Sequence, residues 1–243
     1  MRFDQADYDI RCEWGERGVG ALGPVSDVVI IVDVLSFSTA VETAVGRGAR
    51  VYPFAWRDRE RVKTFAQSIG AIAAGPRGKA RFSLSPLSLS ELPEGARVVL
   101  PSPNGSTLSL ATGQTLTLLG CLRNSAAVAA VARSVARRIA VIPAGERWKG
   151  DRAVRFAIED MLGAGAILSQ LEGRRSAETQ VAVDAFEAAR HALAARLQAS
   201  GSGNELSVCG FEADVAYSAE LDVSRSVPVL RDGAFEAYAQ PEA

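Results

Sequence analysis

The run of residues 28–32 constrains the fold more than any other feature of the sequence. It reads Val-Val-Ile-Ile-Val and is followed directly by Asp33. Five β-branched residues in a row fit a strand that is buried on both faces, because these side chains pack well on a pleated surface and leave no polar face for water. Such strands belong mainly to parallel sheets covered by helices on both sides. This run therefore predicts an α/β fold.

Short apolar runs alternate with helical patterns along most of the chain. We expect further strands at residues 51–54, 71–74, 98–100, 116–119 and 139–142. We expect helices at 38 to Gly46 or Gly48, and at 57–69, 106–111, 125–138, 152–170 and 177–199. This alternation implies crossover connections and a mostly parallel sheet, hence a three-layer α/β/α fold. We expect one domain over residues 1–243, although the pattern is less clear from about residue 171 to 243.

Composition narrows the classes of function. The 243 residues carry a net charge of −1 and are 48% hydrophobic, which suits a large core and argues against nucleic-acid binding. The three cysteines are scattered without a CxxC pair, so we expect a reducing compartment, the cytoplasm. The N-terminus lacks the apolar stretch of a signal peptide, and no window offers the roughly 20 apolar residues of a membrane span.

Asp33 ends the most apolar strand. In open α/β sheets ligands bind at the carboxyl ends of the strands, so residues placed there are candidates for function. A carboxylate buried without a partner is costly, which favours a metal ligand or a catalytic carboxylate at this position. The alternative is an aspartate that simply accepts hydrogen bonds from nearby amides.

Two expected helix starts provide candidate anion-binding residues. Ser38 and Thr39 follow Asp33, and Asn104, Gly105 and Ser106 follow the strand at 98–100. Free amides at a helix N-terminus favour anions, and a glycine turn can cradle a phosphate. Ordinary helix capping and an Asn-Gly turn would place the same residues there.

Charged residues follow the last two expected strands. Arg123 follows residues 116–119, and its guanidinium can bind an anion through two hydrogen bonds. Glu146 and Arg147 follow residues 139–142, where Glu146 repeats the placement of Asp33. Glu159 and Asp160 are adjacent on an expected helix, about 100° apart, so both face inward only if one leans to the side.

Three common phosphatase signatures are absent. The residue six positions after Cys121 is Ala127, so the C-x5-R pattern of cysteine phosphatases fails, and we expect Cys121 to be an inert buried thiol. Leu35 stands where a D-x-D motif would place a second aspartate. The single histidine, His191, is followed by Ala192 and lacks an R-H-G context.

Taken together and in this order, the polar segments resemble the 2-phosphosulfolactate phosphatase family. The segments that carry the resemblance are Val32–Thr39, Ala74–Gly78, Leu84–Pro86, Ser102–Ser106, Leu122–Asn124, Ala144–Arg147 and Ala157–Ala166. They span roughly residues 25–170, and the set is far more specific than any one of its members.

The resemblance implies an α/β/α phosphoric monoester hydrolase that requires Mg²⁺. It would convert 2-phospho-3-sulfolactate to 3-sulfolactate and phosphate, which in archaeal members is a step towards coenzyme M. Carboxylates suit Mg²⁺, which usually takes one or two of them and keeps several waters. The candidate metal ligands are Asp33, Glu146, Glu159 and Asp160, of which Asp33 and Glu146 are also the candidate catalytic residues. The candidate substrate-binding residues are Ser38, Thr39, Asn104, Gly105, Ser106, Arg123 and Arg147. Either a water or Asp33 itself would attack the phosphorus.

Two positions depart from the family pattern. Many members carry arginine directly after Asp-Val-Leu, where this chain has Ser36-Phe37, and Leu84 stands where asparagine is common. Another small phosphorylated hydroxy acid is therefore an alternative substrate, and a non-catalytic protein that binds anionic metabolites is the alternative from another class. We expect a small, multiply anionic substrate whose charge is balanced by loop arginines, namely Arg77, Arg81, Arg123 and Arg147. Any self-association would be into a homo-oligomer.

Overall fold

The computed structural model describes residues 3–55, 59–148, 150 and 153–239. Its main-sheet strands are β1 Ile10–Cys12, β2 Val28–Val32, β3 Arg50–Ala55, β4 Ile72–Ala73, β5 Arg97–Ser102, β6 Leu116–Gly120, β7 Ile139–Pro143, β10 Pro228–Arg231 and β11 Ala234–Ala237. A separate hairpin pairs β8 Glu146–Arg147 with β9 Val154–Arg155. The α-helices are α1 Gly15–Leu22, α2 Phe37–Gly46, α3 Arg59–Ser68, α4 Pro86–Leu89, α5 Gly105–Ala111, α6 Ser125–Val135, α7 Ile158–Leu168, α8 Ala177–Ala189, α9 Leu193–Ala199, α10 Gly201–Val208 and α11 Glu212–Ser218. Short 3₁₀ turns cover Gly23–Val25, Leu122–Asn124 and Arg190–Ala192.

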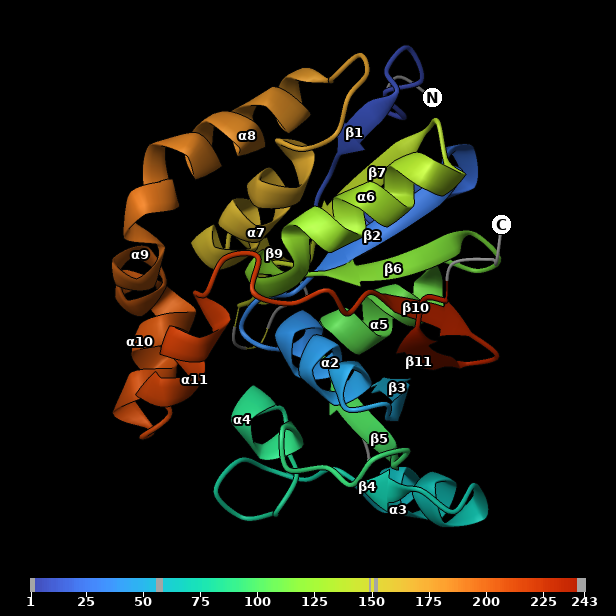
Figure 1. Ribbon diagram of the computed structural model, residues 1–243, viewed down its shortest axis with the longest axis vertical. Coiled ribbons are helices and arrows are strands. Elements are labelled where there is room, and N and C mark those ends of the chain that lie inside the picture. Colours follow the sequence, from blue (N-terminus) through green and yellow to red (C-terminus); the bar gives the residue numbers. More distant parts are fainter. Residues whose placement is uncertain (1–2, 56–58, 149, 151–152, 240–243) are drawn as a thin grey trace.

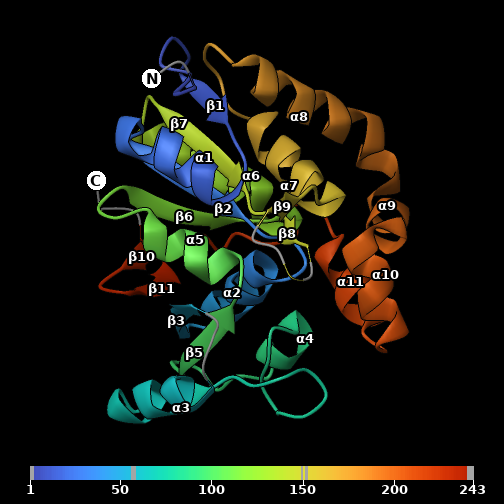
Figure 2. The same ribbon diagram turned by 180° about the vertical axis from the view of Figure 1, so that it is seen from behind.

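The predicted three-layer α/β/α class is confirmed. The main sheet has the order β1-β7-β2-β6-β10-β11-β3-β5-β4, and helices cover both of its faces (Figures 1 and 2). All six predicted strands are present, and β1-β7-β2-β6 and β3-β5-β4 form two parallel blocks. The carboxyl ends of β2 and β7 therefore lie side by side, which brings the segments after them together.

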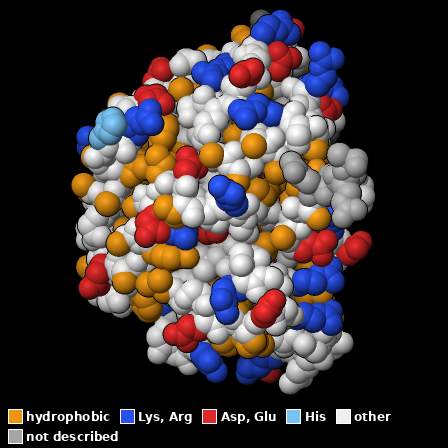
Figure 3. All heavy atoms as spheres, viewed as in Figure 1, with side chains coloured by type: hydrophobic (Ala, Val, Ile, Leu, Met, Phe, Trp, Pro, Cys, Tyr) orange, Lys and Arg blue, Asp and Glu red, His pale blue; other side chains and the backbone are white. Residues whose placement is uncertain are grey.

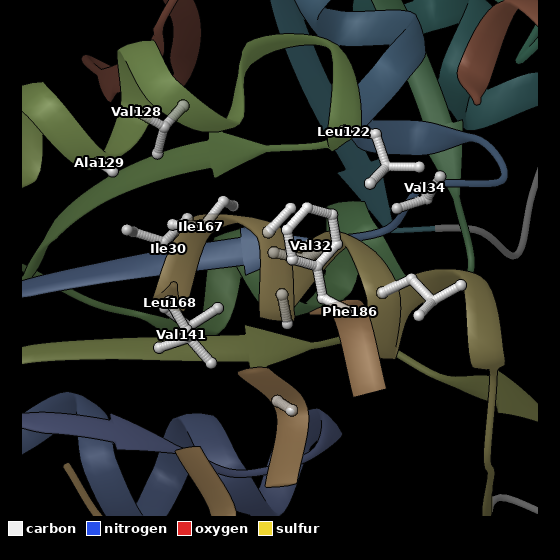
Figure 4. Close-up of a cluster of buried hydrophobic side chains, with 14 of the residues drawn as sticks. Ile30, Val32, Val34, Leu122, Val128, Ala129, Val141, Ile167, Leu168 and Phe186 are labelled. Carbon is white, nitrogen blue, oxygen red and sulfur yellow. The ribbon is translucent and has the colours of Figure 1, made fainter. Parts of the chain in front are cut away.

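The residues of β2 divide the hydrophobic core between the two faces of the sheet. Ile30 and Val32 pack with side chains from α6, α7 and α8, as Figure 4 shows for Val128, Ile167 and Phe186. Val29 and Ile31 pack on the other face with side chains from α1, α2 and α5. All five residues of β2 are fully buried, as the β-branched run predicts.

The C-terminal hairpin was not predicted from the sequence. β10 and β11 pair antiparallel with each other, and they insert between β6 and β3, joining the two parallel blocks. Asp232 and Gly233 at the turn both have positive φ, 48° and 76°, which is the backbone that an Asp-Gly hairpin turn adopts. The Asp-Gly dipeptide is the one feature of the sequence that could have indicated this hairpin. Pro228 lies at the first position of β10, where a proline is tolerated.

Three predicted helices differ from the structure. The helix expected at 125–138 ends at Val135. The helix expected at 152–170 begins only at Ile158, because Val154 and Arg155 form β9. The helix expected at 177–199 is divided into α8 and α9 by the turn Arg190–Ala192. The first two residues of the helix expected at 57–69 lie outside the described residues, and α3 ends at Ser68.

The face seen in Figure 3 carries acidic and basic side chains interspersed, in line with the near-neutral charge of the chain. Within the described residues, no helix is both long enough and apolar enough to cross a membrane.

The contact between α7 and α8 depends on a glycine. A Cβ at Gly165 would lie 2.1 Å from the backbone oxygen of Ala182 and 2.7 Å from Cβ of Phe186. Gly20 in α1 offers a matched comparison, because a Cβ there would meet nothing within 4 Å. The close approach of the two helices therefore requires glycine at position 165 but not at position 20.

We expect Gly165→Ala to lower the free energy of unfolding by about 1–3 kcal/mol, since α8 must move away from the added methyl group. Gly20→Ala should raise it by roughly 0.5–1 kcal/mol, because alanine is the better helix former and no atom obstructs it. Urea unfolding of both variants measures the difference. Equal effects of the same sign would contradict the packing role of Gly165.

Candidate active site

Asp33 lies directly after β2, is 7% exposed and is held by amides from two helix starts. Its Oδ1 accepts a hydrogen bond from the N–H of Phe37 at 3.2 Å, and its Oδ2 accepts one from the N–H of Gly105 at 2.9 Å. The backbone N–H of Asp33 donates to Oγ of Ser38 at 2.8 Å. The starts of α2 and α5 are thereby joined to one carboxylate, whose orientation is fixed.

Asp160 joins the two segments that follow the adjacent strands β2 and β7. One carboxylate oxygen accepts from the N–H of Val34 at 2.7 Å, and the other accepts from the N–H of Gly145 at 2.9 Å. The side chain is 4% exposed. Asp160 therefore holds in place the loops that carry Asp33 and Glu146.

Glu146 is half-buried and belongs to a polar cluster that also includes α1. Its Oε2 accepts from Nδ2 of Asn104 at 3.1 Å and from the N–H of Arg147 at 3.3 Å. Nε of Arg147 donates to Oδ1 of Asn104 at 3.1 Å, and its Nη2 forms an ion pair with Glu16. Asn104 thus bridges two predicted site residues, although β6, β10, β11 and β3 separate β5 from β2 in the sheet.

Glu159 differs from its neighbours because it has no partner. It is 2% exposed at the start of α7, and it makes no hydrogen bond or ion pair with the part of the chain that the structure describes. Its two oxygens are not among the fully buried atoms without a partner, so they remain open to a cation or a ligand at the border of the site. Glu159 is therefore a carboxylate at this site that can bind a further group.

The four carboxylates repel one another electrostatically. Burial raises the pKa of Asp33 to about 7, and the charge of Glu146 adds to the effect. Burial also raises the pKa of Asp160 well above its ordinary value, followed by the charges of Asp33 and Glu159. For Glu146 burial is again the main cause of a raised pKa, with a smaller contribution from Glu159. Each of these residues lies in the field of the others, so the predicted set is assembled in one region.

The chemistry of this set suits a hard divalent cation. Among the described residues, no group of three or more His, Cys, Asp or Glu side chains is arranged so that it could hold a metal ion. Mg²⁺ does not need such a group, because it usually binds one or two carboxylates and retains several waters. The unpartnered Glu159, the half-buried Glu146 and Asp33 are oxygen donors whose repulsion a cation would relieve. Both oxygens of Asp160 already accept amide hydrogen bonds.

The predicted serine and threonine residues are buried, and their hydroxyls bond to the backbone. Oγ1 of Thr39 donates to the oxygen of Val34 at 2.8 Å, and Oγ of Ser106 donates to the oxygen of Leu100 at 3.0 Å. Oγ of Ser38 serves the N–H of Asp33, as described above. Phosphate binding by Ser38, Thr39, Gly105 and Ser106 stays a prediction. The three hydroxyls already bond to the backbone, and the N–H of Gly105 already donates to Asp33.

Arg123 lies in a different environment from the carboxylates. Its Nε donates to Oε2 of Glu42 at 3.1 Å, its Nη1 pairs with Glu220, and its guanidinium lies 3.6 Å from the ring centroid of Tyr217. Although burial acts to lower it, the Glu42 carboxylate raises the pKa of Arg123. Its charge is thus balanced within the protein, and a role in substrate binding stays a prediction.

Cys121 is fully buried and is not arranged for thiol chemistry. Burial raises the pKa of its thiol to about 12, so the thiolate is not populated near neutral pH. Its sulfur lies 3.4 Å from Oδ1 of Asn124, within a capped turn. This environment agrees with the prediction of an inert cysteine.

A cavity of about 590 Å³ opens beside Glu146. Its lining includes the predicted residues Asn104 and Arg147, together with residues of α1 and β9. Its full lining is Glu13, Trp14, Gly15, Glu16, Arg17, Asn104, Leu108, Ala144, Glu146, Arg147, Ala153 and Val154. The contribution of residues 13–17 was missed because β1 is only three residues long and the helix after it contains three glycines and has no capping side chain at its start.

Comparison with known proteins gives a consistent result. Residues 21–233 match the model of the 2-phosphosulpholactate phosphatase family. The chain is 32% identical to a 2-phosphosulfolactate phosphatase of Methanothermobacter thermautotrophicus, over 87% of this chain and 90% of the relative. It is also 32% identical to a probable 2-phosphosulfolactate phosphatase of Carboxydothermus hydrogenoformans, over 82% and 84%, and 31% identical to one of Deinococcus radiodurans, over 85% and 89%.

Glu159 provides a test of the metal site that does not depend on activity. We expect Mg²⁺ to raise the midpoint of thermal unfolding of the wild-type protein at pH 8, because it compensates buried negative charge. Glu159→Gln should be more stable than wild type without Mg²⁺, since the unpartnered charge is gone, and should lose most of the stabilisation by Mg²⁺. The matched control is Glu172→Gln, which changes an exposed glutamate. An unchanged response to Mg²⁺ in Glu159→Gln would contradict its role as a ligand.

Proposed function

The chain belongs to the 2-phosphosulfolactate phosphatase family, and we propose that it hydrolyses 2-phospho-3-sulfolactate to 3-sulfolactate and phosphate with the help of Mg²⁺. The observation that carries this proposal is the placement of the buried, unpartnered Glu159 beside Asp33 and Glu146 within the matched segment. The oxygens of a phosphate ester are negatively charged, so they would bind to a cation held by these carboxylates.

Of the carboxylates of Asp33, Glu146 and Glu159, one or two would hold the metal, since the three are not arranged to do so together. When bound, Mg²⁺ supplies positive charge that polarises the phosphoryl oxygens and neutralises charge developing on them. Asp160 keeps its two amide hydrogen bonds and acts by positioning the loops of Asp33 and Glu146. Glu146 and Glu159 each have an oxygen that accepts no hydrogen bond from the described residues, whereas each oxygen of Asp33 accepts one amide hydrogen bond and would bind the metal through a remaining lone pair.

The residues of this chain also provide a place for the phosphate group. The cavity next to Glu146 is wide enough for a small phosphorylated acid, and Nη1 of Arg147, which makes no hydrogen bond with the described residues, can donate to the phosphate at its edge. Asp33 is held rigidly by the amides of Phe37 and Gly105, so its carboxylate has one fixed direction. From that position Asp33 can attack the phosphorus itself or accept a proton from an attacking water.

Rigid placement makes Asp33 the sharpest single test of the chemistry. We expect Asp33→Asn to remain folded, because asparagine can still accept one of the two amide hydrogen bonds. Its kcat should fall by about 10²-fold or more, the scale of losing one preorganised charged group. Asp184→Asn on the exposed face of α8 is the matched control and should retain full activity. Wild-type turnover by folded Asp33→Asn would rule out its catalytic role.

A substrate panel tests the proposed specificity. The panel contains 2-phospho-3-sulfolactate, 2-phospholactate, 2-phosphoglycolate, AMP and a phosphopeptide, each assayed with Mg²⁺ and with EDTA. We expect 2-phospho-3-sulfolactate to have the highest kcat/KM and EDTA to abolish turnover. First rank for AMP or for the phosphopeptide would contradict the substrate assignment, and full turnover in EDTA would contradict the metal requirement.

A further inference from the structure

Arg77 lies in the loop between β4 and α4 and contacts the loop that carries Asp33. Its Nη2 donates to Oγ of Ser36 at 2.6 Å and to the backbone oxygen of Leu84 at 3.0 Å. Ser36 is buried and precedes the first residue of α2. One edge of the guanidinium is therefore held at the border of the candidate active site.

The C-terminal part of the chain holds Arg77 from another side. Asp214 on α11 is 2% exposed, and its Oδ2 lies 3.8 Å from Nε of Arg77. Both of these atoms are buried, and neither has a hydrogen-bond partner among the residues that the structure describes. Oδ1 of Asp214 accepts a hydrogen bond from Oγ of Ser85 at 2.8 Å. Asp214 thus balances the charge of Arg77 without accepting a hydrogen bond from the guanidinium. An ion pair that served only to stabilise the fold would normally include such a hydrogen bond.

Arg77 retains a donor group that faces no partner. Its Nη1 makes no hydrogen bond with the described residues, and its side chain is 23% exposed. A cavity of about 210 Å³ adjoins it, lined by the segment 74–77 together with Leu84, Leu100 and Pro101. Burial lowers the pKa of Arg77, while the charges of Asp214, Asp33 and Glu146 oppose that change, which places the guanidinium in the field of the site.

The other arginines expected to balance the substrate are engaged or exposed. Arg123 pairs with Glu42 and Glu220, and Arg147 pairs with Glu16 and bonds to Asn104. Arg81 is exposed and lies 5.1 Å from the ring centroid of its neighbour Phe82. Nη1 of Arg147 and Nη2 of Arg123 also make no hydrogen bond with the described residues, but of these four arginines Arg77 alone donates to the loop that carries Asp33.

We infer that Arg77 binds, through Nη1, the acid group that the substrate carries in addition to its phosphate, and that Ser36 and Asp214 position it for this contact. The inference rests on the proposed function and deepens it, because it assigns a residue to the second anionic group. That group is a sulfonate or a carboxylate, both of which accept hydrogen bonds from a guanidinium. Arg77 is then a specificity residue for multiply anionic phosphate esters.

The first test is Arg77→Gln with 2-phospho-3-sulfolactate. We expect kcat/KM to fall about 10- to 100-fold, mainly through KM, which is the scale of losing a charged hydrogen bond. Arg77→Lys should recover part of the loss, because it keeps the charge but not the fork of donors. Arg137→Gln, an exposed arginine before β7, is the matched control. Thermal unfolding of each variant verifies that it is folded.

Truncated substrates identify the group that is bound. 2-Phospholactate lacks the sulfonate, the phosphate ester of 2-hydroxyethanesulfonate lacks the carboxylate, and p-nitrophenyl phosphate lacks both. Arg77→Gln should impair turnover of the truncated substrate that retains the bound group at least 10-fold more than turnover of the other truncated substrate or of p-nitrophenyl phosphate. An equal loss on all substrates, or no loss on any, would overturn the inference.

A binding measurement separates this inference from the proposed function. Calorimetric titration with 3-sulfolactate needs no turnover, and we expect wild type to bind it at least 10-fold more tightly than Arg77→Gln. Asp214→Asn should weaken binding in the wild-type background but add little in the Arg77→Gln background, as expected for a residue that acts through Arg77. Arg77-dependent binding without phosphate release would refute the proposed function alone, whereas binding independent of Arg77 would refute the inference alone.

Discussion

The burial of carboxylates at the carboxyl ends of β2 and β7 is the constraint on which the rest of the site depends. Asp33 and Asp160 are tolerated because each accepts two backbone amide hydrogen bonds. Those amides come from segments far apart in the sequence, so the same bonds that offset burial also assemble the loops. Glu159 accepts no hydrogen bond from the described residues, which leaves its carboxylate open to a cation. This candidate metal ligand is therefore also the side chain that has no hydrogen bond within the described chain to offset its burial.

Arginines around the carboxylates divide into two groups by how their charge is balanced. Arg123 sits between Glu42 and Glu220 and stacks on Tyr217, so it stabilises the packing of the C-terminal segment against α2. Nε of Arg77 lies 3.8 Å from Oδ2 of Asp214, and neither atom makes a hydrogen bond within the described residues. Equal charge thus produces different roles, because hydrogen-bond geometry decides whether a guanidinium is available to a ligand.

Much of the fold was predictable because the parallel strands are buried on both faces, and such strands appear in the sequence as continuous apolar runs. The same reasoning located Asp33, Asn104 and Glu146, since the positions after such strands meet at one edge of the sheet. It could not separate Glu159 from Asp160, because adjacent helical residues differ only in direction, and the amides that select Asp160 belong to distant loops. Sequence reasoning also could not show that Arg123 forms an ion pair with Glu220, because the two residues are 97 positions apart and leave no local pattern.

The C-terminal hairpin explains why the last part of the chain matters to a site built mostly from residues 33–160. β10 and β11 lie between the two parallel blocks, which have no direct strand pairing in the described chain, so the sheet is continuous only when the hairpin is in place. Asp222 on the segment before it accepts hydrogen bonds at the start of α6, and Asp214 on α11 reaches Arg77. The C-terminal residues therefore act together with the bonds from Gly105 to Asp33 and from Asn104 to Glu146 in setting the relative position of the two blocks. A change in the hairpin should alter the site through this geometry, without touching a carboxylate.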